Sequence, residues 1–144
     1  MTQTLDANIL VFSSDDSSPF RDRALTCLDG LMTGDAIVHL FWPTVMAYLR
    51  VATHPNVFRV PLSIDHALAN VKAMVDQPNV RVTGERTDFL SGFDAVVADA
   101  RPTGNLISDA HLVALMRENG VRTIWTHDRD FRRFSGIVVR DPFA

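Results

Sequence analysis

The hydrophobic pattern alternates short apolar runs with longer amphipathic stretches, and this alternation limits the possible folds more than any other feature of the chain. The apolar runs contain several β-branched residues, which is typical of buried strands. These runs are Thr4–Phe12, Ala36–Leu40, Val80–Thr83, Thr123–His127 and Ile137–Arg140. The stretches with helical patterns are Pro19–Met32, Thr44–Ala52, Ser63–Gln77, Thr87–Ala100 and Leu106–Asn119. Strands that alternate with helices predict an α/β/α sandwich with a mostly parallel central sheet.

Local signals support these boundaries. Ser63 is a suitable first cap for one helix, Asn105 or Ser108 for another, and Gly120 is suited to the end of the latter. The segment 53–61 contains two prolines and is predicted to be an exposed loop. In open parallel sheets, sites gather at the carboxyl ends of the strands, so acids at those positions are of particular interest.

Length and charge set the broad class of protein. With 144 residues, 47% of them hydrophobic, residues 1–144 are expected to form one domain with its own core. The 14 Lys and Arg against 17 Asp and Glu require any nucleic-acid contact to use a local basic patch. Cys27 alone closes no internal disulfide and is assigned to the core, and neither a signal peptide nor a membrane-length apolar run is found. A cytoplasmic location is therefore expected.

Asp6 stands in the run LDANILVF, where an aspartate is out of place. If this run is a strand, Asp6 and Asn8 point the same way, and a buried carboxylate there needs a cation or strong donors. The alternative is that the strand begins only at Ile9 and that Asp6 is a solvated turn residue.

Two further segments carry acids at the edges of core elements. Asp109 opens a predicted helix four residues after Asn105, so it is either a metal ligand or a first-turn acid that favours the helix dipole. His111 is expected to face elsewhere. Asp128 and Asp130 follow the strand TIWTH, where an Asx turn is the alternative to metal binding.

Taken together, acids from three core segments favour a hard divalent cation, Mg²⁺ or Mn²⁺ rather than zinc. Signatures of other chemistries are not found, among them a Gly-rich phosphate loop, a GxSxG elbow and a CxxC pair. The acidic chemistry rests on aspartate, because Glu85 and Glu118 are the only glutamates.

The ordered segments LDANILVF, FWPTVMAYLRVATHPNVF, GNLISDAHLVAL and THDRDF resemble the PIN-domain ribonucleases, in particular the VapC toxins of mycobacterial type. The resemblance covers almost the whole chain. It implies that Asp6, Asp109 and Asp128 are catalytic and hold the cation, with Asp130 as a fourth metal ligand. One position departs, because the register of the middle segment puts Ala47 where the family commonly has a glutamate. This departure leaves the primary metal site intact and weakens the case for a second ion.

The resemblance also implies an activity and partners. A Mg²⁺-dependent endoribonuclease of this type hydrolyses RNA phosphodiesters, here in tRNA or rRNA, through a metal-activated water. Arg50 and Arg129 are the candidates for RNA contacts, with Arg132 and Arg133 as further basic residues. A VapB-like antitoxin and a homodimer are the expected protein partners, and no membrane is involved.

Two other functions compete with this one. A PIN-like domain that has lost cleavage, as Ala47 would permit, would still bind RNA or an antitoxin. A phosphoryl-accepting receiver domain is suggested by Asp15 and Asp16 after the first strand, but Lys72, the only lysine, lies within a helical pattern and not where that chemistry needs it.

Overall fold

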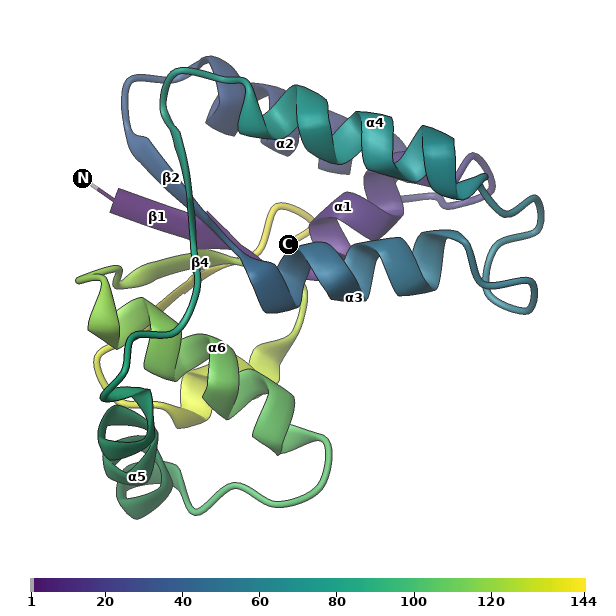
Figure 1. Ribbon diagram of the computed structural model, residues 1–144. Helices are drawn as coiled ribbons and strands as arrows, with labels where there is room; N and C mark the ends of the chain where they lie inside the picture. Colours follow the sequence, from purple (N-terminus) through teal and green to yellow (C-terminus); the bar gives the residue numbers. More distant parts are fainter. Residues whose placement is uncertain (1) are drawn as a thin grey trace.

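A computed structural model describes residues 2–144. Five strands form one sheet: β1 (Thr2–Leu5), β2 (Ile37–Phe41), β3 (Val80–Thr83), β4 (Thr123–Trp125) and β5 (Val138–Arg140). The helices are α1 (Ala7–Ser14), α2 (Arg21–Thr33), α3 (Trp42–Ala52), α4 (Ile64–Val75), α5 (Phe89–Ala100), α6 (Leu106–Glu118) and the 3₁₀ helix η1 (Arg129–Arg133). All strand pairs are parallel, in the order β3-β2-β1-β4-β5 (Figure 1). The predicted α/β fold with a parallel sheet is confirmed.

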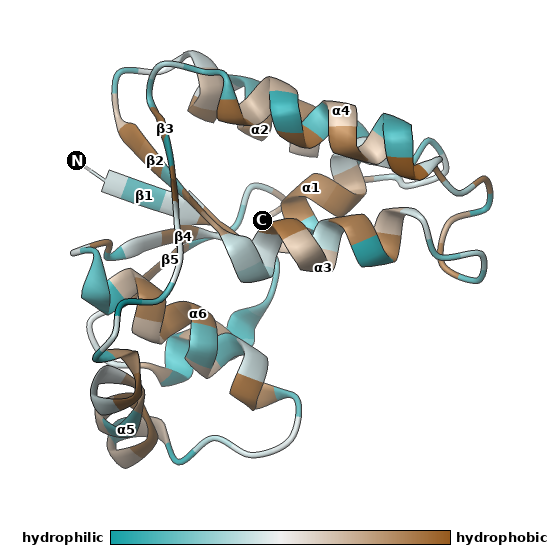
Figure 2. Cartoon of the chain, in the orientation of Figure 1, coloured by the Kyte–Doolittle hydropathy of each residue, from teal (hydrophilic) through white to brown (hydrophobic). Residues whose placement is uncertain are grey.

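The helices cover the sheet in two groups (Figure 1). One core joins α1 to α4 with the sheet around Leu10, Leu40 and Tyr48. The other joins α5, α6 and η1 with the sheet around Val113 and Ile124. Figure 2 shows apolar residues along both α3 and α6. The protein is therefore a three-layered sandwich, as the hydrophobic pattern predicts.

The prediction of a single strand over Thr4–Phe12 is wrong. The strand β1 ends at Leu5, and α1 begins at Ala7 with Asp6 as its N-cap. The Asp6 carboxylate accepts a hydrogen bond of 2.7 Å from the backbone N–H of Ala7. Because α1 packs against both α2 and α3, its residues are apolar on more than one side, and a run of this length has no helical period to read.

The bounds of the other strands and helices agree with the predicted bounds to within two residues. Ser63 caps α4 by accepting a hydrogen bond of 3.1 Å from the backbone N–H of His66. Gly120 follows α6 with a φ of 67°, the left-handed conformation that favours glycine. Asn105 precedes α6, but its side chain makes no capping hydrogen bond. The predicted loop 53–61 lies between α3 and α4.

Within residues 2–144, none of the helices combines the length and the apolar character needed to cross a bilayer.

The strand order places a topological switch point between β1 and β4. The chain leaves β1 toward β2 and β3, whereas β4 and β5 lie on the opposite side of β1. Leu5 and Trp125 are paired at the carboxyl ends of these two strands, and the backbone N–H of Asp6 donates to the Trp125 carbonyl at 2.9 Å. The connections diverge here and leave a crevice, which is where open α/β sheets bind ligands.

Asn79 anchors the edge of the sheet and provides a test of the fold. Its buried amide donates hydrogen bonds of 2.8 Å and 3.0 Å to the carbonyls of Leu31 and Ala36, which fixes the turn between α2 and β2. We predict that Asn79→Ala lowers the free energy of unfolding by about 1–3 kcal/mol, because it leaves buried acceptors without donors. Urea denaturation measures this loss. Asn56→Ala, on the exposed loop after α3, should stay within about 0.5 kcal/mol of wild type, and equal losses would contradict the anchoring role.

Candidate metal centre and active site

Asp6 and Thr126 lie side by side where β1 and β4 end. The hydroxyl of Thr126, which is fully buried, donates a 2.9 Å hydrogen bond to the Asp6 carboxylate. The same hydroxyl accepts hydrogen bonds from the Asn8 amide at 3.2 Å and from the backbone N–H of Asp128 at 2.9 Å. One side chain therefore holds the acid-bearing ends of both strands in a fixed relation.

Asp128 makes the turn that was the alternative to a metal site. Its carboxylate accepts a 2.9 Å hydrogen bond from the backbone N–H of Asp130 and thereby begins η1. This Asx-type turn brings the Asp130 side chain back toward the strand end. The turn and a metal site are thus compatible, because a carboxylate has a second oxygen that is not needed to cap η1.

Asp109 reaches the same place from the first turn of α6. Single carboxylate oxygens of Asp109, Asp128 and Asp130 lie within 4.8 Å of one another. Asp6 lies outside that set but lines, together with Asp109, a cavity of about 370 Å³ at the carboxyl ends of the strands. The structure therefore brings all four predicted aspartates together, from three separate segments of the chain.

The carboxylates disturb one another's ionisation. The pKa of Asp109 is raised to about 7, first by burial and then by the negative charges of the other three aspartates. Burial also raises the pKa of Asp6, against the opposing hydrogen bonds from Thr126 and Ala7. Like charges held in a partly desolvated crevice favour protonation, or neutralisation by a cation. The donor set consists of oxygen atoms, which fits a hard divalent ion.

Residues 4–137 match the PIN domain family. The chain is a PIN-domain protein of the VapC type. It is 44% identical to Ribonuclease VapC48 of Mycobacterium tuberculosis over 144 residues, which cover all of this chain and 99% of that protein. Two solved structures share the fold: VapBC2 from Rickettsia felis, bound to a promoter DNA fragment, and M. tuberculosis VapC20, described as a Sarcin-Ricin loop cleaving toxin. VapBC2 superposes with a TM-score of 0.70 at 11% identity, and the match covers 98% of this chain and 98% of that one. VapC20 superposes with a TM-score of 0.68 at 16% identity, and the match covers 94% of this chain and 96% of that one.

The predicted basic residues of this PIN domain differ in their position. Arg50 projects from α3 and lines the same cavity as Asp6 and Asp109. Arg129 follows Asp128 directly and is exposed at the start of η1, but it does not line that cavity. Arg132 and Arg133 complete η1. Of these side chains, Arg50 is therefore the best placed to meet a phosphate at the aspartates.

The first two turns of α3 supply an uncharged part of the cavity wall. Ala47 lines the acidic cavity, so the position where the family resemblance expects a glutamate does face this site. The neighbouring Thr44 is 3% exposed and lines the cavity as well. Among the residues that the structure describes, its hydroxyl has no hydrogen-bond partner. A buried polar atom of this kind suits a water or a ligand oxygen in the cavity.

The contact between Glu85 and His111, at the edge of the acidic cavity, was not predicted from the sequence. His111 lines the cavity with Asp109, so the expectation that it faces elsewhere is wrong: the cavity extends around α6. Its Nε2 is hydrogen-bonded to Glu85, a contact that lowers the pKa of the Glu85 carboxyl. Phe89 packs edge-on against the same imidazole. The only hint in the sequence was that Glu85 is one of two glutamates, which does not reveal its partner.

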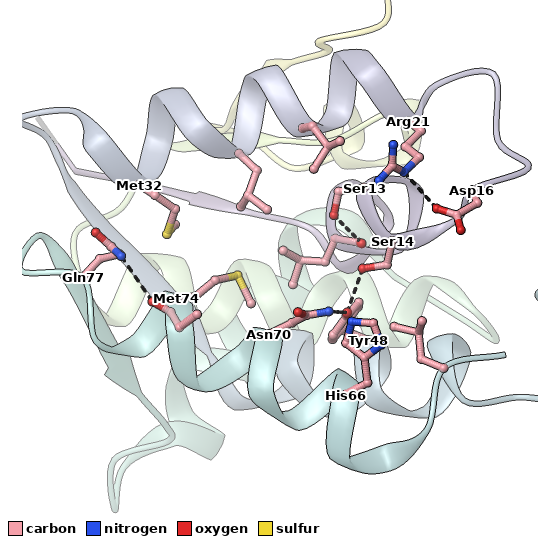
Figure 3. Close-up of a pocket in the computed structure, with 15 residues that line it drawn as sticks. Ser13, Ser14, Asp16, Arg21, Met32, Tyr48, His66, Asn70, Met74 and Gln77 are labelled. Carbon is pink, nitrogen blue, oxygen red and sulfur yellow. Dashed lines mark hydrogen bonds and ion pairs between the residues drawn. The ribbon is translucent and has the colours of Figure 1, made fainter.

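A second hollow of about 420 Å³ lies between α1, α2, α3 and α4 (Figure 3). Tyr48 forms its polar centre, with hydrogen bonds of 2.8 Å to Ser14 and 3.0 Å from the Asn70 amide. Asp16 is the only acid on its wall, and it is paired with Arg21 at 3.2 Å. Among the described residues, the group suited to hold a metal ion includes Asp109 of the acidic cavity and no residue of this hollow.

The raised pKa of Asp109 predicts a pH-dependent response to divalent cations. Because its pKa in the folded protein, about 7, exceeds the ordinary value of 3.8, ionisation of Asp109 destabilises the folded state. The stability that protonated Asp109 contributes is therefore fully present below about pH 4 and is lost as the pH rises through about 7. We expect the Tm of the metal-free protein to fall between pH 6 and 8, and Mn²⁺ to raise Tm more at pH 8 than at pH 6.

Thermal unfolding of two variants tests the assignment. Asp109→Asn should flatten the metal-free fall in Tm and reduce the gain from Mn²⁺. The control Asp29→Asn, on the exposed face of α2, should behave as wild type does. An Mn²⁺ effect of equal size at both pH values would show that Asp109 is not the titrating group.

Proposed function

We propose that this PIN-domain protein is the toxin of a type II toxin–antitoxin pair and acts as a Mg²⁺-dependent endoribonuclease. The observation that carries the proposal is the cluster of four aspartates at the switch point, one of them with a pKa raised to about 7. The name of its relative at 44% identity, a ribonuclease, supports the same activity. A cluster of carboxylates without a cation would repel a phosphodiester, so the arrangement needs a metal ion to act on RNA.

In this proposal the four aspartates share the binding of the ion. Asp6, Asp109 and Asp128 hold the ion, and Asp130 completes the set from the start of η1. The chemistry that a bound Mg²⁺ would supply there is activation of a water for attack on phosphorus and stabilisation of charge on the phosphoryl oxygens. Thr126 keeps the Asp6 carboxylate oriented through its 2.9 Å hydrogen bond. The free hydroxyl of Thr44 is available to a water or a phosphate oxygen.

Positive side chains would bind the RNA backbone beside the acids. Arg50 contacts a phosphate from the wall of the cavity, and Arg129 contacts a more distant phosphate from the surface of η1. The net charge of −3 gives no general attraction for RNA, so these local contacts set the affinity. A structured RNA such as tRNA or rRNA is the proposed substrate, in keeping with the description of VapC20 as a Sarcin-Ricin loop cleaving toxin.

The proposed protein partner is a VapB-like antitoxin encoded beside this chain. The support comes from fold neighbours solved as VapBC pairs from Rickettsia felis and Salmonella typhimurium. We also propose that the toxin forms a homodimer in the cytoplasm. Sedimentation of the purified toxin, alone and with the product of the adjacent reading frame, measures both associations.

The activity has a direct test. We predict that the purified protein cuts a structured RNA in Mg²⁺ or Mn²⁺ and stops in excess chelator. Asp6→Asn should lower the rate about 100-fold or more, because it removes a charge that holds the ion. The Asp29→Asn variant should cut at the wild-type rate. In cells, expression of the wild type but not of Asp6→Asn should arrest growth.

Contamination and loss of activity give different results in this experiment. Cleavage that persists in chelator, or that is equal in Asp6→Asn prepared the same way, would identify a contaminating nuclease. Binding of RNA without cleavage by the wild type would favour the second candidate function, a PIN-like binding module. The alanine at position 47 is the observation that favours that alternative, because it removes an acid from the cavity wall.

The position of Ala47 also predicts a loose metal site. Ligand number governs the affinity for a strongly hydrated ion such as Mg²⁺, so one ordered cation at most and a requirement for about 1 mM metal are expected. Ala47→Glu should tighten Mn²⁺ binding about tenfold in calorimetric titration. Ala47→Gln, of similar size without the charge, is the matched control. Equal effects of the two variants would mean that position 47 does not face the ion.

A further inference from the structure

Three side chains of α3 form an exposed strip that we name the α3 ridge: Trp42, Met46 and Arg50. Their spacing of four residues places them on one face of the helix. Trp42 is 46% exposed and Met46 is 56% exposed, although both are large apolar side chains at the surface of the domain. Arg50, one turn further along, is exposed as well. The ridge therefore presents an aromatic face, a thioether and a guanidinium in a row.

The α3 ridge is continuous with the acidic cavity. Met46 and Arg50 line the cavity together with Asp6 and Asp109. A molecule bound at the aspartates therefore meets Met46 and Arg50 directly, and Trp42 lies one helical turn beyond Met46. The ridge therefore runs along the cavity from Arg50 through Met46 to Trp42 at the beginning of α3.

One edge of the Trp42 indole lies close to Gly84. A Cβ atom added at Gly84, just after β3, would lie 3.0 Å from Cδ1 of Trp42. The glycine thus lets one edge of the ring lie close against the chain, while nearly half of the side chain stays open to solvent. An aromatic ring fixed at one edge and exposed elsewhere costs little entropy when a flat ligand stacks on it.

The chemistry of the ridge matches a single-stranded nucleotide segment. Bases stack on aromatic side chains without regard to sequence, and arginine binds the phosphates between them. The acids repel the RNA backbone until a cation neutralises them, and the whole chain is acidic. Stacking supplies affinity that does not depend on charge. Such affinity matters at this site, because charge alone gives little attraction between an acidic protein and RNA.

We propose that the α3 ridge binds the unpaired RNA segment next to the scissile phosphate, with one base stacked on Trp42 and an adjacent phosphate on Arg50. This inference rests on the ribonuclease activity proposed above. It makes Trp42 a residue that positions the substrate and takes no part in metal binding.

Binding of two labelled probes isolates the stacking contribution. The first probe is a 12-nucleotide single-stranded RNA of mixed sequence, and the second is the same backbone with abasic riboses. Fluorescence anisotropy is measured in the Asp6→Asn background with Mn²⁺ present, so that the RNA is not cut. Trp42→Ala should weaken binding of the first probe about tenfold and leave the abasic probe unchanged. Trp42→Phe should restore most of the affinity.

Two further readouts distinguish positioning from a general structural effect. In cleavage assays, Trp42→Ala should raise KM about tenfold and leave the calorimetric affinity for Mn²⁺ unchanged. Bound RNA should quench the intrinsic fluorescence of the wild type, and Trp42→Phe should abolish the quenching. The remaining indole, Trp125, donates a 2.9 Å hydrogen bond to Gln3 and does not line the acidic cavity. The matched control is Val75→Ala, which truncates an exposed apolar side chain on α4 and should behave as wild type in both assays.

Each outcome bears on a different claim. Equal binding of both probes by wild type and Trp42→Ala, or equal weakening of both, would overturn the stacking role. A change in sedimentation coefficient in Trp42→Ala without a change in RNA affinity would assign the ridge to a contact between protein chains and overturn the inference. A wild type that neither binds nor cuts RNA would refute the ribonuclease proposal itself.

Discussion

The site depends on the hydroxyl of Thr126. A threonine hydroxyl offers one donor and two acceptor positions, and here Asp6, Asn8 and the backbone of Asp128 occupy all of them. The side chain has no exposed surface, so no water competes for these positions. The two strand ends that carry acids are therefore fixed to each other through a single atom, and the orientation of the carboxylates follows from the sheet and not from flexible loops.

The sheet concentrates negative charge where the strands diverge. Parallel pairing of β1 with β4 brings Asp6 next to the segment of Asp128, and α6 adds Asp109 from above the crevice. Burial and the negative charges of the neighbouring aspartates raise the pKa of Asp109 as a consequence of this arrangement. A fold that used these positions only for stability would place paired or apolar residues there. Local electrostatic strain of this kind marks functional sites, because a ligand relieves it.

Much of the fold could be predicted from the sequence because its strands are short, buried and separated by amphipathic helices. The exception is the N-terminal run, where four apolar residues of α1 led to the prediction of a strand. This segment is a helix packed against α2 and α3, so tertiary packing overrides the local pattern. The predicted acids converge because each follows or begins a core element. The contact of Glu85 with His111 joins residues 26 positions apart and no periodicity encodes it.

In the proposed activity, metal and RNA bind this site in a coupled way. Without an ion, the carboxylates oppose any phosphate that Arg50 attracts, since both groups border one cavity. An ion reverses the sign of the local field, so that the cavity and Arg50 then act on the backbone together. Because position 47 is an alanine, an ion held by the aspartates would have no ligand from this position, and a phosphate oxygen would be able to serve as a ligand. Each ligand thus strengthens the binding of the other, as linkage between the two equilibria requires.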